Sequence, residues 1–299
     1  MYKSDINLNL YKTFYDVANY GSISKTAEAT YTSQPAISKS IKKLEESLNT
    51  KLFYRSASGV ELTDKGKELL YYVEKSYGSL LTAERMMVED KSLKRGKLSI
   101  GMPSNVGTFY LFDKIVDFHN KYPNIEITII TGGTHRLIEL LDSHTIDFII
   151  DTAPINIENK EMTCKKLIKV NYSFAVKKDT KKFDYKNIKS LKDLKKLPLI
   201  LPIPGTSNRT NLDELLIKNN VKIENVLNIH TSEMIVSAIK KELGIGYIIS
   251  NVVKNDNEIE ILKLKEKLPT VDIDIVYNEN YLSTAPKKFI NEYIEYKIK

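Results

Sequence analysis

The first residues that could carry chemistry lie on one side of the stretch 34–48. Apolar residues recur there every three or four positions, which is the spacing of one helix face. The opposite face carries Gln34, Ser38, Lys39 and Lys42. A side-chain amide can pair with the edge of adenine, and lysines bind backbone phosphate, so this face has the chemistry of a DNA-binding helix. A solvated helix face would show the same pattern, and the surrounding residues must decide between the two.

A second group of polar residues lies in four short loops of the C-terminal half. Each loop follows an apolar run and precedes a helical pattern. Their hydroxyl groups and the free backbone N–H groups at helix N-termini favour an anion such as a carboxylate. Each loop alone is explained by helix capping, and only their convergence points to a ligand. The predicted binding residues are Ser104, Asn105, Thr131, Gly132, Gly133, Thr134, Thr206, Ser207 and Ser232.

Three helical patterns and a short hairpin occupy the first 62 residues. The helices are predicted at 8–20, Ile23–Thr30 and 34–48, and the two strands of the hairpin within 51–62. Ser33 can cap the third helix, and Pro35 lies in its first turn, where a missing N–H group costs nothing. These elements make a helix-turn-helix followed by a wing, which would present the third helix to the major groove.

A long helix, capped by Thr63 and reaching to about Asp90, carries an apolar stripe close to a heptad repeat. A helix of this length cannot bury the stripe within so small a domain. We therefore predict a partner helix from a second chain. The charged segment Lys91–Arg95 follows, and we place a linker there.

After the linker, apolar strands alternate with helical patterns, which predicts an α/β fold with a parallel sheet. Strands are expected at 98–102, 125–130, 146–151, 172–177, 198–201, 226–230, 245–249 and 272–277, and helices at 106–121, 135–143, 208–219, 232–243 and 285–298. Because the carboxyl ends of parallel strands share one edge of a sheet, the four polar loops should converge.

Composition excludes several classes of protein. The 299 residues carry a net charge of +7, but residues 1–65 hold only nine basic against seven acidic residues, so charge does not locate a DNA site. No apolar run approaches the ~18 residues that span a membrane, and the N-terminus lacks a secretion signal, so we expect a cytoplasmic protein. Cys164 is the single cysteine, and the four histidines lack metal-ligand spacing, so we expect no disulfide, metal or cofactor.

The stretch 14–70 resembles the DNA-binding domain of LysR-type transcriptional regulators. Residues that match in order and at the right spacing are Phe14, Val17, Ala18, Gly21, Ser22, Ala27, Glu28, Ser33, Gln34, Pro35, Ala36, Ser38, Ile41, Leu44, Glu45, Leu48, Leu52, Phe53, Arg55, Leu62, Thr63 and Gly66. Departures fall at Thr26 and Thr30 in the second helix, where the family usually has Ala and Leu. A third falls at Asn49, where a Gly is usual.

The resemblance implies which residues contact DNA and how the chain assembles. Contacts are expected from Ser33, Gln34, Pro35, Ser38, Lys39, Lys42 and, at backbone phosphate, the wing residue Arg55. The helix 64–90 should form an antiparallel dimer, whose two reading heads favour a roughly palindromic site on double-stranded DNA. Such regulators are usually homotetramers, and RNA polymerase is a further candidate partner.

Residues 95–299 resemble the effector domain of the same family, which is similar in fold to periplasmic solute-binding proteins. The expected organisation is a mainly α winged helix-turn-helix domain (1–63), a dimerisation helix with linker (64–94) and an α/β effector domain (95–299). Two subdomains are expected, I (95–156 and 269–299) and II (157–268), with crossings near Thr152–Glu161 and Lys263–Thr270. A small anionic effector in the cleft between them would control activation or repression.

Three other interpretations stay open. The regulator could bind DNA without an effector, and a solute-binding protein would share the α/β fold but would lack the winged helix. An enzyme would need a nucleophile with a paired base, a metal motif or a phosphate-binding loop, and the sequence offers none, so no catalytic residue is assigned. Arg136 and Arg209 adjoin two of the loops and could pair with an acidic ligand, but we assign both to the surface.

Overall fold

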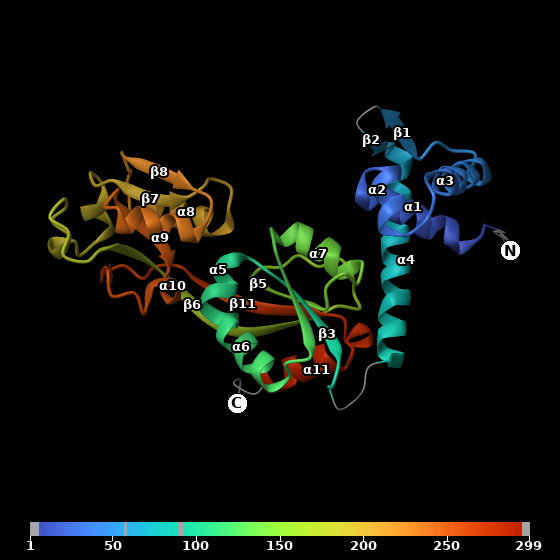
Figure 1. Cartoon of the computed structure of the whole chain (residues 1–299). Helices are drawn as coiled ribbons and strands as arrows, with labels where there is room; N and C mark the ends of the chain where they lie inside the picture. The colour runs from blue at the N-terminus through green and yellow to red at the C-terminus, as the bar shows by residue number, and fades with distance from the viewer. Residues whose placement is uncertain (1–5, 57–58, 89–92, 295–299) are drawn as a thin grey trace. The chain divides into compact units, whose positions relative to one another are not determined.

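The computed structural model describes residues 6–56, 59–88 and 93–294 (Figure 1). The chain divides into two compact units. The N-terminal unit comprises residues 1–89 with two short later segments, 139–146 and 281–283, and the second unit contains the remaining residues. Among the described helices, none is both long and apolar enough to cross a membrane.

The N-terminal unit is a helix-turn-helix with a hairpin and a long helix. Its elements are α1 (Leu8–Tyr20), α2 (Ile23–Ala29), α3 (Gln34–Leu48), β1 (Phe53–Ser56), β2 (Gly59–Leu62) and α4 (Asp64–Val88). The predicted short helices and hairpin are confirmed, and α2 ends one residue early, because Thr30 forms its cap and bonds back to the Thr26 carbonyl at 2.8 Å. The end of the long helix near Asp90, and the linker residues 91 and 92, lie outside the described residues.

A small apolar core fixes the orientation of α3. Phe14, Val17, Ile41 and Leu44 are almost completely buried where α1, α2 and α3 meet. The predicted inward positions of α3 are therefore confirmed, with Leu48 half-buried at the margin. Each buried side chain of this size contributes about 1.5–3 kcal/mol, so the core determines which face of α3 points outward.

The second unit is built on one mixed sheet. Its strands are β3 (Gly96–Met102), β4 (Ile125–Thr131), β5 (Phe148–Thr152), β6 (Thr163–Lys177), β7 (Leu199–Pro202), β8 (Val226–Ile229), β9 (Ile245–Ile249), β10 (Ile259–Ile261) and β11 (Thr270–Tyr277). The order is β4-β3-β5-β11-β6-β9-β7-β8, and β10 pairs with β6. The prediction of a parallel sheet is correct for β4-β3-β5 and β9-β7-β8 only. Between them, β11 and β6 run antiparallel to their neighbours.

β6 is the largest departure from the expected elements, because only its last six residues were predicted as a strand. Residues 163–171 pair with β11, and residues 172–175 pair with β9, so this one strand passes from one half of the sheet to the other. The chain therefore crosses later than the segment Thr152–Glu161. Residues 163–169 include three lysines, all exposed, and only Leu167 is buried. The segment therefore lacks the apolar run of a buried strand.

Helices cover the sheet and begin close to the predicted positions. They are α5 (Ser104–Val106), α6 (Phe112–Lys121), α7 (Thr134–Asp142), α8 (Ser207–Lys218), α9 (Ser232–Lys240), α10 (Ser250–Val253) and α11 (Thr284–Phe289), with short turns η1 (Gly107–Leu111), η2 (Tyr185–Asn187), η3 (Leu191–Leu194), η4 (Glu279–Tyr281) and η5 (Ile290–Ile294). The predicted helix 106–121 is a continuous helical run with a wide π turn at η1. The last helix changes to a π turn at η5, and residues 295–298 of the prediction are outside the described range.

Candidate DNA-binding helix and effector site

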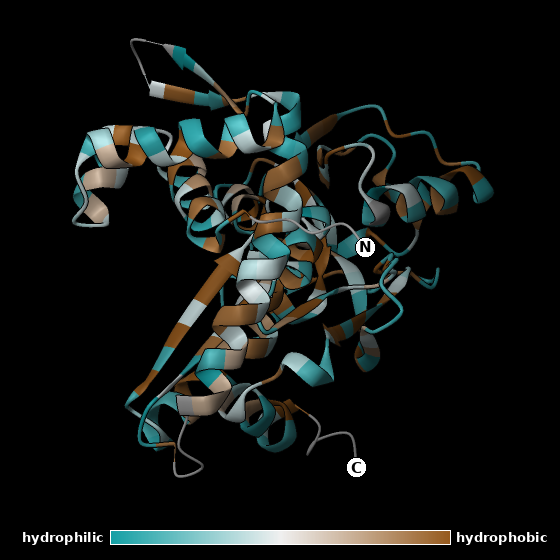
Figure 2. Cartoon of the chain, turned by 90° about the vertical axis from the view of Figure 1, so that its right-hand side faces the viewer, coloured by the Kyte–Doolittle hydropathy of each residue, from teal (hydrophilic) through white to brown (hydrophobic). Residues whose placement is uncertain are grey.

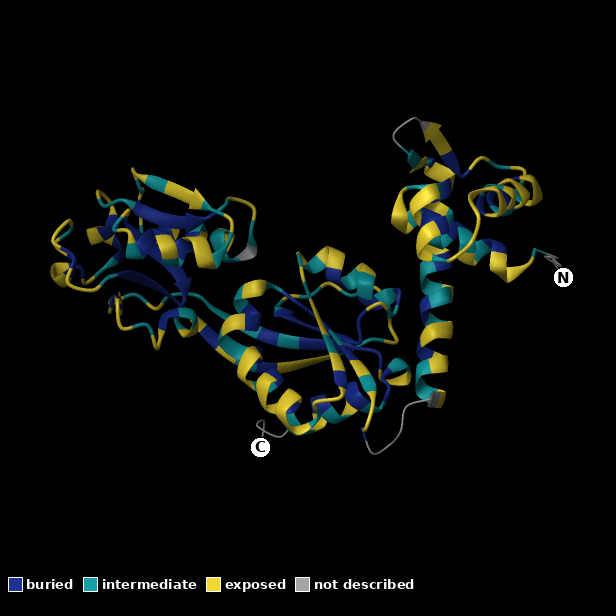
Figure 3. Cartoon of the chain, in the orientation of Figure 1, coloured by how far each residue is buried: buried dark blue, intermediate teal, exposed yellow. Residues whose placement is uncertain are grey.

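The outer face of α3 consists of polar residues that the core leaves exposed (Figure 3). Gln34, Pro35, Lys39 and Lys42 are exposed, and Ser38 is half-buried. An amide, a hydroxyl and two ammonium groups thus share one helix face above a packed core. This arrangement can place side chains against base edges and phosphates at the same time.

Two of the predicted DNA-binding residues already have partners within the chain. The Ser33 hydroxyl accepts the backbone N–H of Ala36 at 3.4 Å and caps α3. The Lys42 ammonium lies 3.6 Å from the Glu46 carboxylate, and both side chains are mostly exposed. Such a surface pair contributes little free energy, so phosphate can replace Glu46 as the partner of Lys42.

Tyr31 is a further candidate that is absent from the predicted set. Its exposed fraction is 99%, and its backbone φ of 52° places it in the left-handed region, in the turn between α2 and α3. It lines a shallow surface depression together with Ser24, Ala27, Glu28, Thr32, Ser33 and Gln34. An aromatic residue inside a predicted helix-turn-helix turn is the sequence signal that could have identified it.

The wing is held against α3 by the buried carboxylate of Glu45, while Arg55 on β1 is exposed. Glu45 accepts the backbone N–H groups of Leu52 at 2.9 Å and Phe53 at 3.3 Å, and the Lys51 ammonium at 2.9 Å. Burial opposes ionisation, but these donors outweigh it and lower the pKa of Glu45. The Glu45 carboxylate therefore positions the wing and its Arg55, although the tip at residues 57 and 58 is not described.

In the second unit, each predicted loop lies at the carboxyl end of a strand. Residues 103–105 and 131–134 follow the parallel strands β3 and β4, and residues 203–207 and 230–232 follow β7 and β8. Each half of the sheet therefore gathers two loops at one edge. Ser104, Thr131 and Gly133 are exposed, and Asn105, Gly132, Thr134, Thr206 and Ser232 are half-buried. The side chain of Ser207 is not described.

Some hydroxyl groups in these loops serve the local backbone. Thr206 donates to the Ile203 carbonyl at 2.9 Å, and Thr231 caps α9 by accepting the Met234 N–H at 3.4 Å. Thr134 instead donates to the carboxylate of Asp151 at 2.7 Å. Of these three threonines, Thr134 is the one whose hydroxyl joins a second element.

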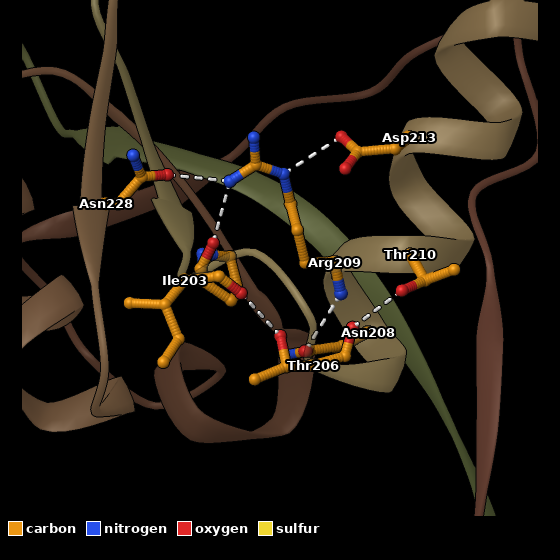
Figure 4. Close-up of polar contacts among 8 residues, drawn as sticks. Ile203, Thr206, Asn208, Arg209, Thr210, Asp213 and Asn228 are labelled. Carbon is orange, nitrogen blue, oxygen red and sulfur yellow. Dashed lines mark hydrogen bonds and ion pairs between the residues drawn. The ribbon is translucent and has the colours of Figure 1, made fainter.

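The assignment of Arg209 to the surface is wrong. Its side chain is only 13% exposed and joins α8 to two strands (Figure 4). Nε donates to Asp213 at 2.9 Å, and Nη1 donates to the Pro202 carbonyl at 2.8 Å and to Asn228 Oδ1 at 2.7 Å. The guanidinium thus holds the start of α8 against the ends of β7 and β8. Arg136, in contrast, is exposed on α7 as expected.

Asp151, near the end of β5, is a polar residue of this edge that is absent from the predicted set. It is 1% exposed and accepts the Thr134 hydroxyl at 2.7 Å, the Thr152 N–H at 2.6 Å and the Thr152 hydroxyl at 3.2 Å. Burial raises its pKa more than these hydrogen bonds lower it. An acidic residue closing an otherwise apolar strand, Phe148–Thr152, is the signal that could have identified it.

Two buried tyrosines belong to the other half of the sheet. Tyr172 on β6 and Tyr247 on β9 stack with ring centroids 5.0 Å apart. Burial raises the pKa of Tyr172 to about 12, with a hydrogen bond from Asn208 lowering it and the charge of Asp151 raising it further. Asp151 and Tyr172 are therefore close enough for the carboxylate to act on the phenol, although they come from different halves of the sheet.

Other candidates for chemistry do not form a cluster. Within residues 6–56, 59–88 and 93–294, no group of three or more His, Cys, Asp or Glu side chains could hold a metal ion. Cys164 is exposed on β6, and its thiol lies 3.8 Å from Asp274 Oδ2, with burial and that carboxylate raising the pKa of the thiol.

The chain matches two family models and is similar to known proteins along most of its length. A bacterial regulatory helix-turn-helix protein model of the lysR family matches residues 8–67, and a LysR substrate binding domain model matches residues 91–296. The probable RuBisCO transcriptional regulator of Phaeodactylum tricornutum is 28% identical over 284 residues and 92% of each chain. The transcriptional regulator YofA of Bacillus velezensis is 25% identical over 94% of this chain and 95% of that one.

Two solved structures have the same fold. Full-length OxyR from Pseudomonas aeruginosa, as a point variant, superposes with a TM-score of 0.71 at 20% identity, over 97% of this chain and 93% of that one. Full-length CbnR in complex with its target DNA gives 0.70 at 16% identity, over 97% and 99%. Because the substrate-binding model alone matches more than half of the chain, and a lysR-type helix-turn-helix precedes it, the chain belongs to the LysR family of transcriptional regulators.

Proposed function

We propose that this regulator binds a roughly palindromic DNA site as a homotetramer, and that a small anionic effector in the second unit controls activation or repression. The observation that carries the proposal is the outer face of α3, where Gln34, Lys39 and Lys42 are exposed above a packed core. A helix held in this way can enter the major groove without disturbing the fold that positions it.

The residues of the DNA-binding surface have different roles in this proposal. Gln34 can form two hydrogen bonds to an adenine edge and so contributes sequence specificity. Lys39, Lys42 and Arg55 bind phosphate, which positions the helix without reading bases. Ser33, Pro35 and Ser38 are compact enough to let the backbone of α3 approach the DNA closely.

Dimerisation through α4 is supported by apolar residues that the N-terminal unit leaves exposed. Tyr72, Leu80, Leu81 and Met87 are exposed on α4, along which apolar and polar segments alternate in Figure 2. Packing this helix against the same helix of a second copy would remove their apolar surface from water, at about 25 cal/mol per Å² buried. Two α3 helices would then be presented together, as a palindromic site requires.

Exposed apolar residues of the second unit offer a second surface for assembly into a tetramer. β4 and β8 are the two edge strands of the long sheet path, and both carry exposed apolar side chains, Ile129 and Leu227. Adjacent helices add exposed Phe112 and Val116 on α6 and Ile217 on α8. Apolar edges of this kind are suited to association with another copy.

The effector is proposed to bind between the loops at the carboxyl ends of β3, β4, β7 and β8. Residues Ser104, Asn105, Thr131–Thr134, Thr206, Ser207 and Ser232 are the candidate contacts. An effector that binds one arrangement of the two sheet halves more tightly than another shifts the population toward it. The alternative of an effector-independent regulator is favoured by the local roles of the Thr206 and Thr231 hydroxyls.

The proposed location and second partner of the protein follow from its being a transcriptional regulator. A regulator of this kind works in the cytoplasm, where DNA is found, and RNA polymerase is its second macromolecular partner. We assign it no reaction and no cofactor.

Gel retardation with DNA upstream of the gene for this protein, at low salt, tests the DNA-binding proposal. The wild type should retard this DNA, and Gln34→Ala should bind it about tenfold more weakly, since one bidentate base contact is worth about 1–3 kcal/mol. Asn255→Ala, which removes an exposed amide of the second unit, should bind like the wild type. Failure of the wild type to retard any of this DNA would contradict the proposal.

The effector proposal needs a separate measurement. Carboxylate metabolites are screened by thermal shift, because a ligand that binds only the folded protein raises its melting temperature. A binder should also change the gel-retardation pattern. If the protein binds DNA and none of the carboxylates alters this binding, the effector-independent alternative is supported.

A further inference from the structure

Asp151 is a buried carboxylate that has no positively charged partner among the described residues. Its side chain is 1% exposed, and its three hydrogen bonds come from the neutral donors Thr134 and Thr152. Among the described groups that shift its pKa there is no lysine, arginine or histidine. A buried carboxylate is unfavourable for folding unless it is paired, so its presence at this edge calls for another explanation.

The register of the sheet adds a second carboxylate. Asp274 on β11 is paired with Asp151 across the sheet, so the two side chains lie on the same face. One oxygen of Asp274, Oδ1, is buried without a hydrogen-bond partner among the described residues. Lys166, its partner on β6, is bonded at 2.6 Å to Asp272, and its charge only partly offsets the burial that raises the pKa of Asp274. The face beside Asp151 is therefore suited to a cation.

Polar groups from the other half of the sheet also lie near Asp151. The Tyr172 phenol lies within electrostatic range of Asp151 and is bonded by Asn208, the second residue of α8. The hydroxyl of Tyr247, which stacks on Tyr172, is buried and has no hydrogen-bond partner among the described residues. Unsatisfied buried hydroxyl groups are rare and indicate a missing polar partner.

We propose that Asp151 binds the ammonium group of the effector, which is an α-amino acid or a closely similar amino carboxylate. The inference rests on the proposed effector site, whose helix N-termini take the carboxylate of the ligand. Asp151 is attached to one half of the sheet and Tyr172 to the other, so an ammonium bound beside Asp151 contacts both halves. The hydroxyl of Thr134 holds the carboxylate of Asp151 in position for this contact.

The test uses the full-length protein and a panel of paired probes. The probes are the twenty proteinogenic amino acids, each matched with the carboxylic acid that lacks its amino group, for example glutamate with glutarate. Thermal shift finds the binders, and titration calorimetry measures their affinity. At least one amino acid should bind, and its deaminated partner should bind about tenfold or more weakly, because hydrogen bonds to charged groups are the stronger ones.

Two variants separate Asp151 from the fold around it. Asp151→Asn keeps the size of the side chain and removes its charge, so it should reduce amino-acid affinity about tenfold or more without lowering the melting temperature of the free protein. Asp147→Asn is the matched control, because Asp147 is also buried, precedes the same strand and accepts the Ser99 N–H at 2.7 Å. This control should retain the preference for the amino acid.

The outcomes distinguish this inference from the proposal on which it rests. If the deaminated acids bind as tightly as the amino acids, or if Asp151→Asn leaves the amino-acid affinity unchanged, the role of Asp151 is wrong while the effector site stands. If no amino acid binds the wild type, the inference is rejected. If carboxylates also fail to bind or to alter DNA retardation, the proposed effector site is rejected with it.

Discussion

The outer face of α3 and the surroundings of Asp151 present polar groups in opposite ways. On α3 the polar side chains are exposed and make few contacts within the chain, whereas Asp151 is buried and held by three hydrogen bonds. The difference matches the size of the expected partner. DNA is a large polyanion that meets a surface, but a small ligand needs an enclosed site that replaces its hydration shell.

The same contrast predicts how changes in each region should act. Residues on the exposed face of α3 can change with little effect on folding, because their groups stay in water in both states. Buried residues that hold elements together, among them Phe14, Glu45 and Arg209, should change stability first and binding second. The variants below test this separation between the two units and within each of them.

The largest effect should come from Phe14→Ala in the core of the N-terminal unit. Phe14 is completely buried, and such a truncation costs about 3–5 kcal/mol of the free energy of unfolding. Scanning calorimetry should show the N-terminal unit melting earlier, with loss of DNA retardation. Phe289 is equally buried in the second unit, so Phe289→Ala should lower the stability of that unit. DNA binding, which depends on the N-terminal unit, should be retained. A single transition that shifts equally in both variants would show that the units do not melt separately.

Glu45→Ala should have the next largest effect, because it leaves the N–H groups of Leu52 and Phe53 without their acceptor. The expected loss is about 2–3 kcal/mol. Because the folded-state pKa of Glu45 is lowered, its stabilising contribution is present above the ordinary value of 4.5 and is lost as pH falls below it. Urea unfolding at pH 7 and pH 3 should therefore show a smaller difference between variant and wild type at pH 3. Glu46→Ala, on the exposed side of α3, is the control and should change little at either pH.

The helix-turn-helix could be predicted from sequence because its signals are local. The Ser33 cap, Pro35 in the first turn and the periodic residues Ile37, Ile41 and Leu44 lie within twelve consecutive positions, and the structure confirms each of them. Helix periodicity and caps act over three or four residues, so neighbouring positions contain the necessary information.

The features that could not be predicted depend on residues far apart in the chain. The first part of β6 is a strand because it pairs with β11, more than a hundred residues later. Arg209 is structural because Asn228 and Pro202 meet it in space. Asp151 is held by the hydroxyl of Thr134 on another element, a contact that strand periodicity cannot show.

Arg209→Ala should destabilise the second unit by about 2 kcal/mol, since it removes three hydrogen bonds, one of them to a carboxylate, from a mostly buried group. Arg209→Lys should recover little of this, because an ammonium lacks the planar fork that reaches Asp213 and Asn228 together. Thermal unfolding monitored by circular dichroism measures both. Arg136→Ala, on the surface of α7, is the control. If lysine restored the stability fully, the positive charge alone would account for the role of Arg209, and its hydrogen bonds between α8 and the strands would not be needed.

The smallest effect should come from Lys39→Ala on the outer face of α3. Lys39 is exposed, so stability should be unchanged, and the loss of one phosphate contact should weaken binding similarly on specific and unrelated DNA. The slope of log K against log salt should become less steep by about one. Lys178→Ala removes the same charge from an exposed site in the second unit and should leave the slope unchanged. If Lys39→Ala instead reduces the preference for specific DNA and leaves the slope unchanged, Lys39 reads bases, and the sequence-reading surface of α3 extends beyond Gln34.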